Sequence, residues 1–339
     1  MRRVLCFVAL ALSAVVLSAG AAGACGGLVG ENGTIQLTRT TTLAAYHDGI
    51  ERYVTSFQFS GTGEAVGSIV PLPGVPTKVE RGGDWTLQRL EREIRPPALE
   101  ERAFDVAASQ AAGAEVLQQT QVDALDITIL RGGGDEVGRW AIDHGFLLTP
   151  DAPEVLDFYS HRSKIFMAAR FDASRAAALG QASGDGTPIM LTIPTDEPWV
   201  PLRILALGLE SSQVVDADVF LLTDDRPTVL AADAGVDAVR SEPASSSLLD
   251  DLRSDAHMGW VPESMWLTYY DVSTAAGGLR HDLAVSTHPE TLPSARMAGF
   301  SVGASTADDG GWWLPLLLLV GVPLVLVAGG RIVARRGTS

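Results

Sequence analysis

The sequence predicts a mixed α+β domain that is mainly antiparallel β-sheet with a few short helices, followed by one C-terminal transmembrane helix. Three observations lead to this prediction. Alternating or continuous apolar runs of strand length recur along the chain between Gly, Asp and Pro turns. Short stretches with apolar residues at helical spacing lie among them. Near the end of the chain, residues 312–330 contain no charged side chain.

The composition is that of a globular protein with an apolar bias. Of the 339 residues, 46% are apolar and 19% are charged. A chain of this length can form one large domain or about two ordinary ones, each with a buried core.

The first 24 residues are typical of a secretory signal peptide. Arg2 and Arg3 are followed by an apolar run over 4–17 and then by small residues that end at Ala24. We therefore expect cleavage after Ala24 and export of the chain that follows.

Cys25 would be the first residue of the exported chain and its only cysteine, so an intrachain disulfide is excluded. The order Ala22-Gly23-Ala24-Cys25 loosely matches a lipoprotein cleavage box, which makes Cys25 a candidate for lipidation. Such boxes usually carry Leu where this chain has Ala22. A free or structural thiol is therefore the preferred interpretation.

Residues 312–330 predict a membrane anchor. As a helix, these 19 residues would be about 28 Å long, which is close to the hydrocarbon thickness of a bilayer. Trp312 and Trp313 lie where an aromatic belt is expected. The positive-inside rule places the following basic residues in the cytoplasm; these are Arg331, Arg335 and Arg336.

These signals predict a single-pass protein of the bacterial plasma membrane, with its N-terminal bulk outside and its C-terminus in the cytoplasm. Residues 25–298 would form the extracytoplasmic domain, 299–311 a small polar stalk and 331–339 the cytoplasmic tail. Within the domain, we expect a subdomain boundary near 132–150 and a linker near 232–247.

The sequence of the first part of the domain predicts a hairpin and two helices. Two alternating runs meet at Asp48-Gly49, a turn pair that accepts positive φ. The second run is predicted to be half-buried, and a strand ending in prolines near Pro71 would suit a sheet edge. Asp84 is expected to cap a helix that Pro96 stops. Another helix should end at Gly145.

In that second helix, which starts near Asp135, His144 shares a face with Trp140 and is interpreted as a core residue whose hydrogen bonds are satisfied. Pro153 should open a further short helix that runs through Tyr159.

The remaining domain is predicted to be mostly strand, with a short helix after the serines at 245–247. Apolar runs bounded by turn residues predict strands over 164–171, 188–195, 200–208, 214–223, 227–231, 265–272 and 279–289.

Charge and motifs limit the chemistry. The two terminal segments hold five arginines and no acid, so the exported part carries 20 basic against 41 acidic residues. This charge disfavours nucleic acid as a partner. The chain lacks the usual nucleotide, phosphate, serine-hydrolase and zinc motifs, and we expect no cofactor.

Two sets of residues come closest to a reactive site. His281, Asp282 and His288 are the nearest approach to a metal cluster, but two histidines seven residues apart on a strand face opposite sides. Asp216 and Asp218 share one face of a strand, and a paired-carboxylate hydrolase would need two of the chain's acids to converge in a pocket.

Three stretches of the exported part resemble a known family. They are ACGGLV over 24–29, the segment from Tyr53 to Pro96 that contains VPLPGVP, and IPTDEPWVPLRILALG over 193–208. Together they resemble the bacterial exported family called domain of unknown function 2330, over 25 to about Tyr270. The resemblance implies export and frequent membrane tethering. It implies no activity, substrate or catalytic residue.

The sequence therefore favours a non-enzymatic protein: a membrane-tethered binding or envelope-organising module. Its expected partners are the lipid bilayer, through the C-terminal helix, and an unknown envelope protein or ligand. The alternative is a cell-envelope hydrolase that uses acidic residues. No catalytic residue is assigned.

Overall fold

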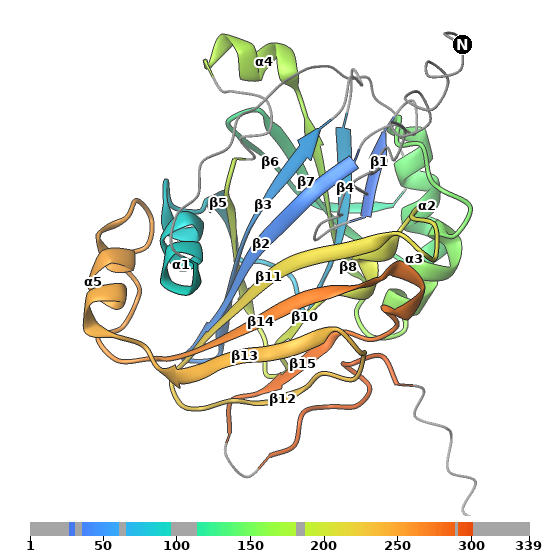
Figure 1. Cartoon of the computed structure of the whole chain (residues 1–339). Coiled ribbons are helices and arrows are strands. Elements are labelled where there is room, and N and C mark those ends of the chain that lie inside the picture. Colours follow the sequence, from blue (N-terminus) through green and yellow to red (C-terminus); the bar gives the residue numbers. More distant parts are fainter. Residues whose placement is uncertain are drawn as a thin grey trace, which may run out of the picture. The chain divides into compact units, whose positions relative to one another are not determined.

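Three β-sheets organise the chain in the computed structural model (Figure 1). The residues that the structure describes are 27–30, 36–60, 66–95, 114–180, 187–288 and 291–300. All strand pairs in these residues are antiparallel except β2 and β11, which are parallel. With a few short helices, this confirms an α+β fold rich in antiparallel sheet.

The largest sheet has seven strands, and strands distant in sequence are neighbours in it. Their order is β13 (Val236–Pro243), β14 (Trp266–Ala275), β11 (Val214–Thr223), β2 (Gln36–His47), β3 (Ile50–Ser60), β9 (Ile189–Pro194) and β5 (Lys78–Arg81).

The second sheet has five strands and the third has three. The five-stranded order is β1 (Gly27–Gly30), β4 (Val66–Leu72), β8 (Ile165–Phe171), β7 (Leu125–Arg131) and β6 (Glu115–Val122). The three-stranded order is β10 (Trp199–Val200), β15 (Leu283–Ser286) and β12 (Thr228–Leu230).

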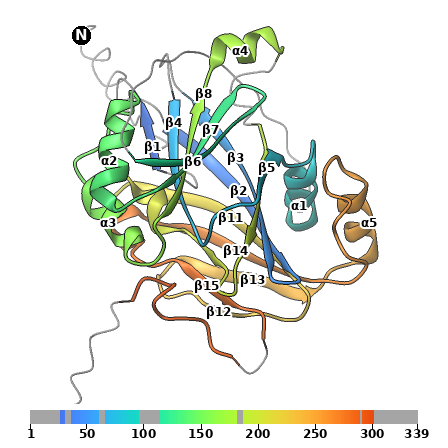
Figure 2. The same cartoon turned by 180° about the vertical axis from the view of Figure 1, so that it is seen from behind.

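The helices are short and lie at the sheet faces and connections (Figures 1 and 2). They are α1 (Thr86–Ile94), α2 (Gly134–Asp143), α3 (Ala152–Ser160), α4 (Ala173–Ala178) and α5 (Ser246–Ser254), with the 3₁₀ turns η1 (Arg203–Ala206) and η2 (Ala276–Gly278).

The central strands of the seven-stranded sheet are buried on both faces. Leu43 and Val54 belong to a core shared with the leucines of α1 and α5. Their neighbours Ala44 and Tyr53 belong to the other core, which also contains residues of the five-stranded sheet, α2 and α3. The prediction that β3 is half-buried is therefore wrong over 51–56, where nearly every residue is buried.

The turn between β2 and β3 confirms the predicted hairpin. Asp48 has φ 53° and Gly49 has φ 74°, the left-handed values that a tight two-residue turn requires at both positions. His47 pairs with Ile50 directly across this turn.

The N-terminus of α1 is capped by a residue distant in sequence, and the predicted cap by Asp84 is wrong. The Asp255 carboxylate accepts the backbone N–H groups of Asp84 and Trp85, at 3.0 Å each, and the Thr86 hydroxyl at 2.7 Å. The Trp85 side chain is 38% exposed. A carboxylate at this position satisfies N–H groups that have no partner within the helix and interacts favourably with the helix dipole.

Two further expectations about strands are corrected. Residues 200–208 form the end of β10 and then η1, because the Asp282 carboxylate accepts the N–H groups of Leu202 and Arg203. β4 is an interior strand, although β1 pairs only with Val66–Ile69 and leaves Pro71 next to β8 alone.

The domain boundaries suggested by the sequence fall within regular structure. The stretch near 232–247 contains β13, paired with β14, and the stretch near 132–150 contains α2. The described residues all belong to one compact unit that ends at Ser301.

No helix among the described residues is both long and apolar enough to span a membrane. The predicted signal peptide, Cys25 and the predicted span at 312–330 lie outside those residues.

Glu51 of β3 is a buried acid next to the three-stranded sheet. Its side chain is inaccessible to solvent. Burial raises the pKa of Glu51 to about 8, and the nearby Trp199 backbone, which lowers the pKa, offsets only part of this effect. The carboxyl is therefore mostly protonated at neutral pH.

Replacing Asp255 with Ala is expected to lower the free energy of unfolding by roughly 2 kcal/mol, because α1 loses the acceptor for its first N–H groups. Urea denaturation of the purified full chain measures this change. Asp237→Ala, at an exposed position of the edge strand β13, is the control and should cost less than about 0.5 kcal/mol. Equal losses in the two variants would contradict the capping role.

The same contact predicts a pH dependence. Burial raises the pKa of Asp255, but hydrogen bonds from Asp84, Thr86, Trp85 and Ala256 outweigh it and hold the pKa below its ordinary value of 3.8. Such a group contributes stability that is present above the unfolded pKa and is lost as pH falls through the folded pKa. The stability difference between wild type and Asp255→Ala should therefore shrink below about pH 4.

Glu51→Gln is expected to stabilise the chain increasingly as pH rises. In wild type the unfolded carboxyl ionises near pH 4.5 and the folded one near 8, so the unfolded state binds fewer protons between these values and stability falls across them. The amide has no such ionisation. Thermal unfolding at pH 5, 7 and 9 measures the difference, with exposed Glu197→Gln as control; a gain that does not vary with pH would contradict the assignment.

Candidate functional site

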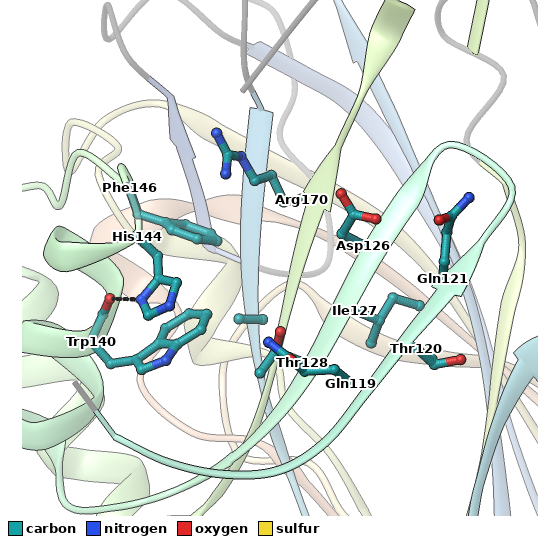
Figure 3. A pocket seen from close by; sticks show the side chains of 11 residues that line it. Gln119, Thr120, Gln121, Asp126, Ile127, Thr128, Trp140, His144, Phe146 and Arg170 are labelled. Atoms are coloured by element: carbon teal, nitrogen blue, oxygen red, sulfur yellow. Dashed lines mark hydrogen bonds between the residues drawn. The ribbon is translucent and has the colours of Figure 1, made fainter. Parts of the chain in front are cut away.

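A polar pocket lies on one face of the five-stranded sheet, beside α2 (Figure 3). Its volume is about 380 Å³, within the range of small-molecule sites, roughly 300–1,000 Å³. The lining side chains come from β6, β7, β8, α2 and the turn after α2; they are Gln119, Thr120, Gln121, Asp126, Ile127, Thr128, Trp140, His144, Phe146, Ala168 and Arg170.

The strand register explains the floor of the pocket. Gln119 pairs with Thr128, which pairs with Ala168. Two residues further along, Gln121, Asp126 and Arg170 form a second row. Directly paired residues share a face, and so do residues two apart on one strand. The two rows therefore place polar groups from three strands on one surface.

The wall of the pocket is built by the end of α2. His144, the residue directly after α2, follows Trp140 by four positions, which places the two side chains on one side of the helix end. Their rings stack with centroids 3.8 Å apart and an interplanar angle of 21°. Gly145, at φ 82°, ends the helix and the chain turns back to Phe146.

Phe146 closes the pocket by packing on a glycine. A Cβ atom added at Gly67 would lie 2.2 Å from Cε1 of Phe146. Any side chain at this position would therefore clash with the ring. Gly67 of β4 pairs with Arg170 of β8. The ring therefore lies close to the sheet backbone next to the second polar row.

The hydrogen bonds within the wall of the pocket show which of its ring nitrogens already have a partner. Nδ1 of His144 lies 2.7 Å from the carbonyl oxygen of Trp140, and because a carbonyl only accepts, Nδ1 carries the proton. The Trp140 side chain is almost fully buried, and its Nε1 has no hydrogen-bond partner within the described part of the chain. His144 is partly exposed, so its interpretation as a core residue is wrong.

The pocket is lined by charged side chains of both signs. Asp126 accepts a hydrogen bond from Nη2 of Arg175 at 2.7 Å, and it lies opposite Arg170 in the register. Among the described residues that line the pocket, Asp126 is the one carboxylic acid and Arg170 the one guanidinium. The formal charges of the lining therefore balance.

The residues that the sequence suggested for a metal cluster do not converge. Nδ1 of His281 lies 2.8 Å from Asp233, and its ring stacks on Phe300. Asp282 is buried and bonded to other groups, and His288 is exposed beyond β15. No group of three potential metal ligands occurs in the part of the chain that the structure describes.

Asp282 instead holds three segments together. One of its oxygens lies 2.6 Å from Nη2 of Arg162, whose side chain is 3% exposed. The other accepts the Tyr159 hydroxyl at 2.9 Å. Arg162 donates to the carbonyl oxygen of Met297 and lies over the rings of Phe158, Tyr159 and Trp199. These contacts join the end of α3, the start of η1 and the segment at 291–300.

Asp218 is also part of a structural contact. Its buried carboxylate accepts two hydrogen bonds from Arg95, at 2.8 and 2.9 Å, and one from the Tyr269 hydroxyl at 2.6 Å. Burial and the Asp218 carboxylate raise the pKa of Tyr269. Asp216, two residues earlier, is partly exposed. Asp218 therefore ties the end of α1 to the sheet, and neither Asp216 nor Asp218 is among the residues that line the pocket.

The remaining residues singled out by the sequence lie outside the described part of the chain. They are Cys25, Trp312, Trp313, Arg331, Arg335 and Arg336. Conversely, sequence reasoning missed the pocket. The spacing of Trp140 and His144 was its only local signal, since the other lining residues come from strands whose pairing the sequence does not state.

Two solved structures, both of baculovirus P35, are similar to this chain. The first has 10% identity and a TM-score of 0.41, and the match covers 75% of this chain and 97% of P35. The second is a mutated P35 after caspase cleavage, with 8% identity, a TM-score of 0.36 and coverage of 74% and 94%. A likeness at this level carries no argument about the present protein. No curated protein sequence matches the chain.

A family profile matches residues 19–252, which include β1, β6, β7, β8 and α2 and therefore every residue that lines the pocket. The chain belongs to the family described as "Uncharacterized protein conserved in bacteria (DUF2330)".

Proposed function

We propose that this protein is an extracytoplasmic binding module, tethered to the bacterial plasma membrane, that holds a small polar ligand in the pocket beside α2. The observation that carries binding is the pocket itself. Seven of the eleven described residues that line it have polar or charged side chains, and they come from three strands and the end of α2. Sites with several convergent polar groups fix the orientation of a ligand.

The location of the module rests on the sequence patterns of the two ends. The predicted signal peptide over 1–24 would direct export, and the predicted helix over 312–330 would anchor the chain. Trp312 and Trp313 would lie at the outer interface, with the arginines at 331, 335 and 336 in the cytoplasm. The tether would restrict the search for a ligand to the cell envelope.

The pocket favours binding over hydrolysis. A glycosidase of the common type needs two carboxyl groups about 5 to 10 Å apart. Asp126 is the one carboxylic acid among the lining residues, and it already bonds Arg175. The described residues of the pocket therefore offer hydrogen-bonding groups without a carboxylate pair.

The proposed topology predicts the outcome of cysteine labelling in intact cells. In a Cys25→Ser background, Ser247→Cys, at an exposed position of α5, should react with a membrane-impermeant maleimide. Ser339→Cys should react only after permeabilisation, because the positive-inside rule places the C-terminus in the cytoplasm.

The Cys25→Ser chain without an added cysteine is the control for background labelling, and a permeant maleimide confirms that both positions are reactive. Labelling of Ser339→Cys in intact cells, or protection of Ser247→Cys, would contradict the topology.

A further inference from the structure

We infer that the ligand of this pocket is an uncharged, hydroxyl-rich molecule, that is, a saccharide unit. This inference rests on the proposed binding function and names the ligand class of the same site. It follows from the donors and acceptors that the pocket presents, together with the balance of its charges.

His144 provides an acceptor. Its Nδ1–H donates to the carbonyl oxygen of Trp140 at 2.7 Å, so in the neutral imidazole Nε2 carries a lone pair and no proton. A group that only accepts hydrogen bonds, such as a carboxylate or a fully ionised phosphate oxygen, would face this lone pair without a shared proton. A hydroxyl group can donate to it.

The indole of Trp140 lies beside this acceptor. Its indole is stacked on the imidazole and lines the pocket. Its Nε1–H is buried without a hydrogen-bond acceptor within the described residues, and a buried donor of this kind costs free energy until an acceptor reaches it. A hydroxyl oxygen accepts as well as donates, so a hydroxyl-rich ligand suits the His144 lone pair and would also satisfy this N–H if it reached it.

The floor has the same dual character. The amide of Gln119 and the hydroxyl of Thr128 each donate and accept, and Gln121, whose Nε2 already donates to the Asp123 carbonyl oxygen, keeps one N–H and its amide oxygen. Asp126 and Arg170, opposite each other in the register, balance the charge of the lining. Phe146 and Ala168 add apolar surface against which the C–H face of a sugar ring can pack. An ionic ligand would meet no excess of opposite charge here.

The test is isothermal titration of the full chain in detergent with defined probes. The neutral probes are glucose, cellotetraose and chitotetraose; the charged probes are tetragalacturonate and inorganic phosphate. We expect at least one neutral saccharide to bind and both charged probes to bind at least about tenfold more weakly, or not at all. Tighter binding of a tetramer than of glucose would indicate a glycan chain as the ligand, and equal binding would indicate a free sugar.

Pocket variants locate the binding. Trp140→Phe keeps the ring and removes the N–H, and Gln119→Ala removes an amide from an exposed position. Each should weaken saccharide binding by about fivefold to tenfold, which corresponds to one lost hydrogen bond. Gln118→Ala, the next residue on β6 and outside the lining, and Trp85→Phe, at the start of α1, should leave binding unchanged. Thermal unfolding checks that each variant is folded.

The outcomes separate this inference from the proposed function. Suppose that tetragalacturonate or phosphate binds, that this binding depends on Trp140 and Gln119, and that neutral saccharides do not bind. This result would support the proposed binding module but contradict the inference that its ligand is a saccharide. Saccharide binding that the two variants leave unchanged would overturn the assignment to this pocket. No binding of any probe would overturn both proposals, whereas a contrary result from cysteine labelling would overturn only the location.

Discussion

Burial on both faces of the central strands is the constraint on which the rest of this structure depends. Along β2, β3, β9 and β11, successive side chains enter two different cores. A shift of one residue in pairing would exchange the two sets, for example placing Tyr53 where Val54 packs. Both faces must also be covered: α1 and α5 provide one cover, and the five-stranded sheet with α2 and α3 provides the other (Figures 1 and 2).

The covering elements are held by polar contacts between residues far apart in sequence. Asp255 binds the start of α1, and Asp218 binds Arg95 just after its end, so both ends of a nine-residue helix are fixed to other parts of the fold. Asp282 likewise binds the start of η1 and the end of α3. Isolated helices of this length are marginal in water, which explains why short helices need partners at their ends. It also explains why Asp255, Asp218 and Asp282 have structural roles.

The pocket forms where the outer face of the five-stranded sheet is not covered by helices. On the outer face of the five-stranded sheet, Leu130 and Phe166 are fully buried, whereas the next two rows of the same face carry Gln119 and Thr128, then Gln121 and Asp126. α2 ends at the boundary between these regions and presents Trp140 and His144 to the polar rows. The same sheet thus serves as core at one end and as the floor of a site at the other, and a ligand would complete the cover.

The sequence by itself determined features whose causes are local. Asp48-Gly49 makes the β2–β3 turn, Gly145 ends α2, apolar spacing predicts α1 and Pro153 opens α3, because each depends on residues within one or two turns of chain. Only the tertiary structure decided the rest. The run over 200–208 is apolar enough for a strand, but Asp282, about 80 residues away, takes its N–H groups and it becomes η1. Asp255 displaces Asp84 as the cap of α1, and the pocket joins β6, β7, β8 and α2. In each case the deciding partner is brought near by sheet pairing, which local patterns do not encode.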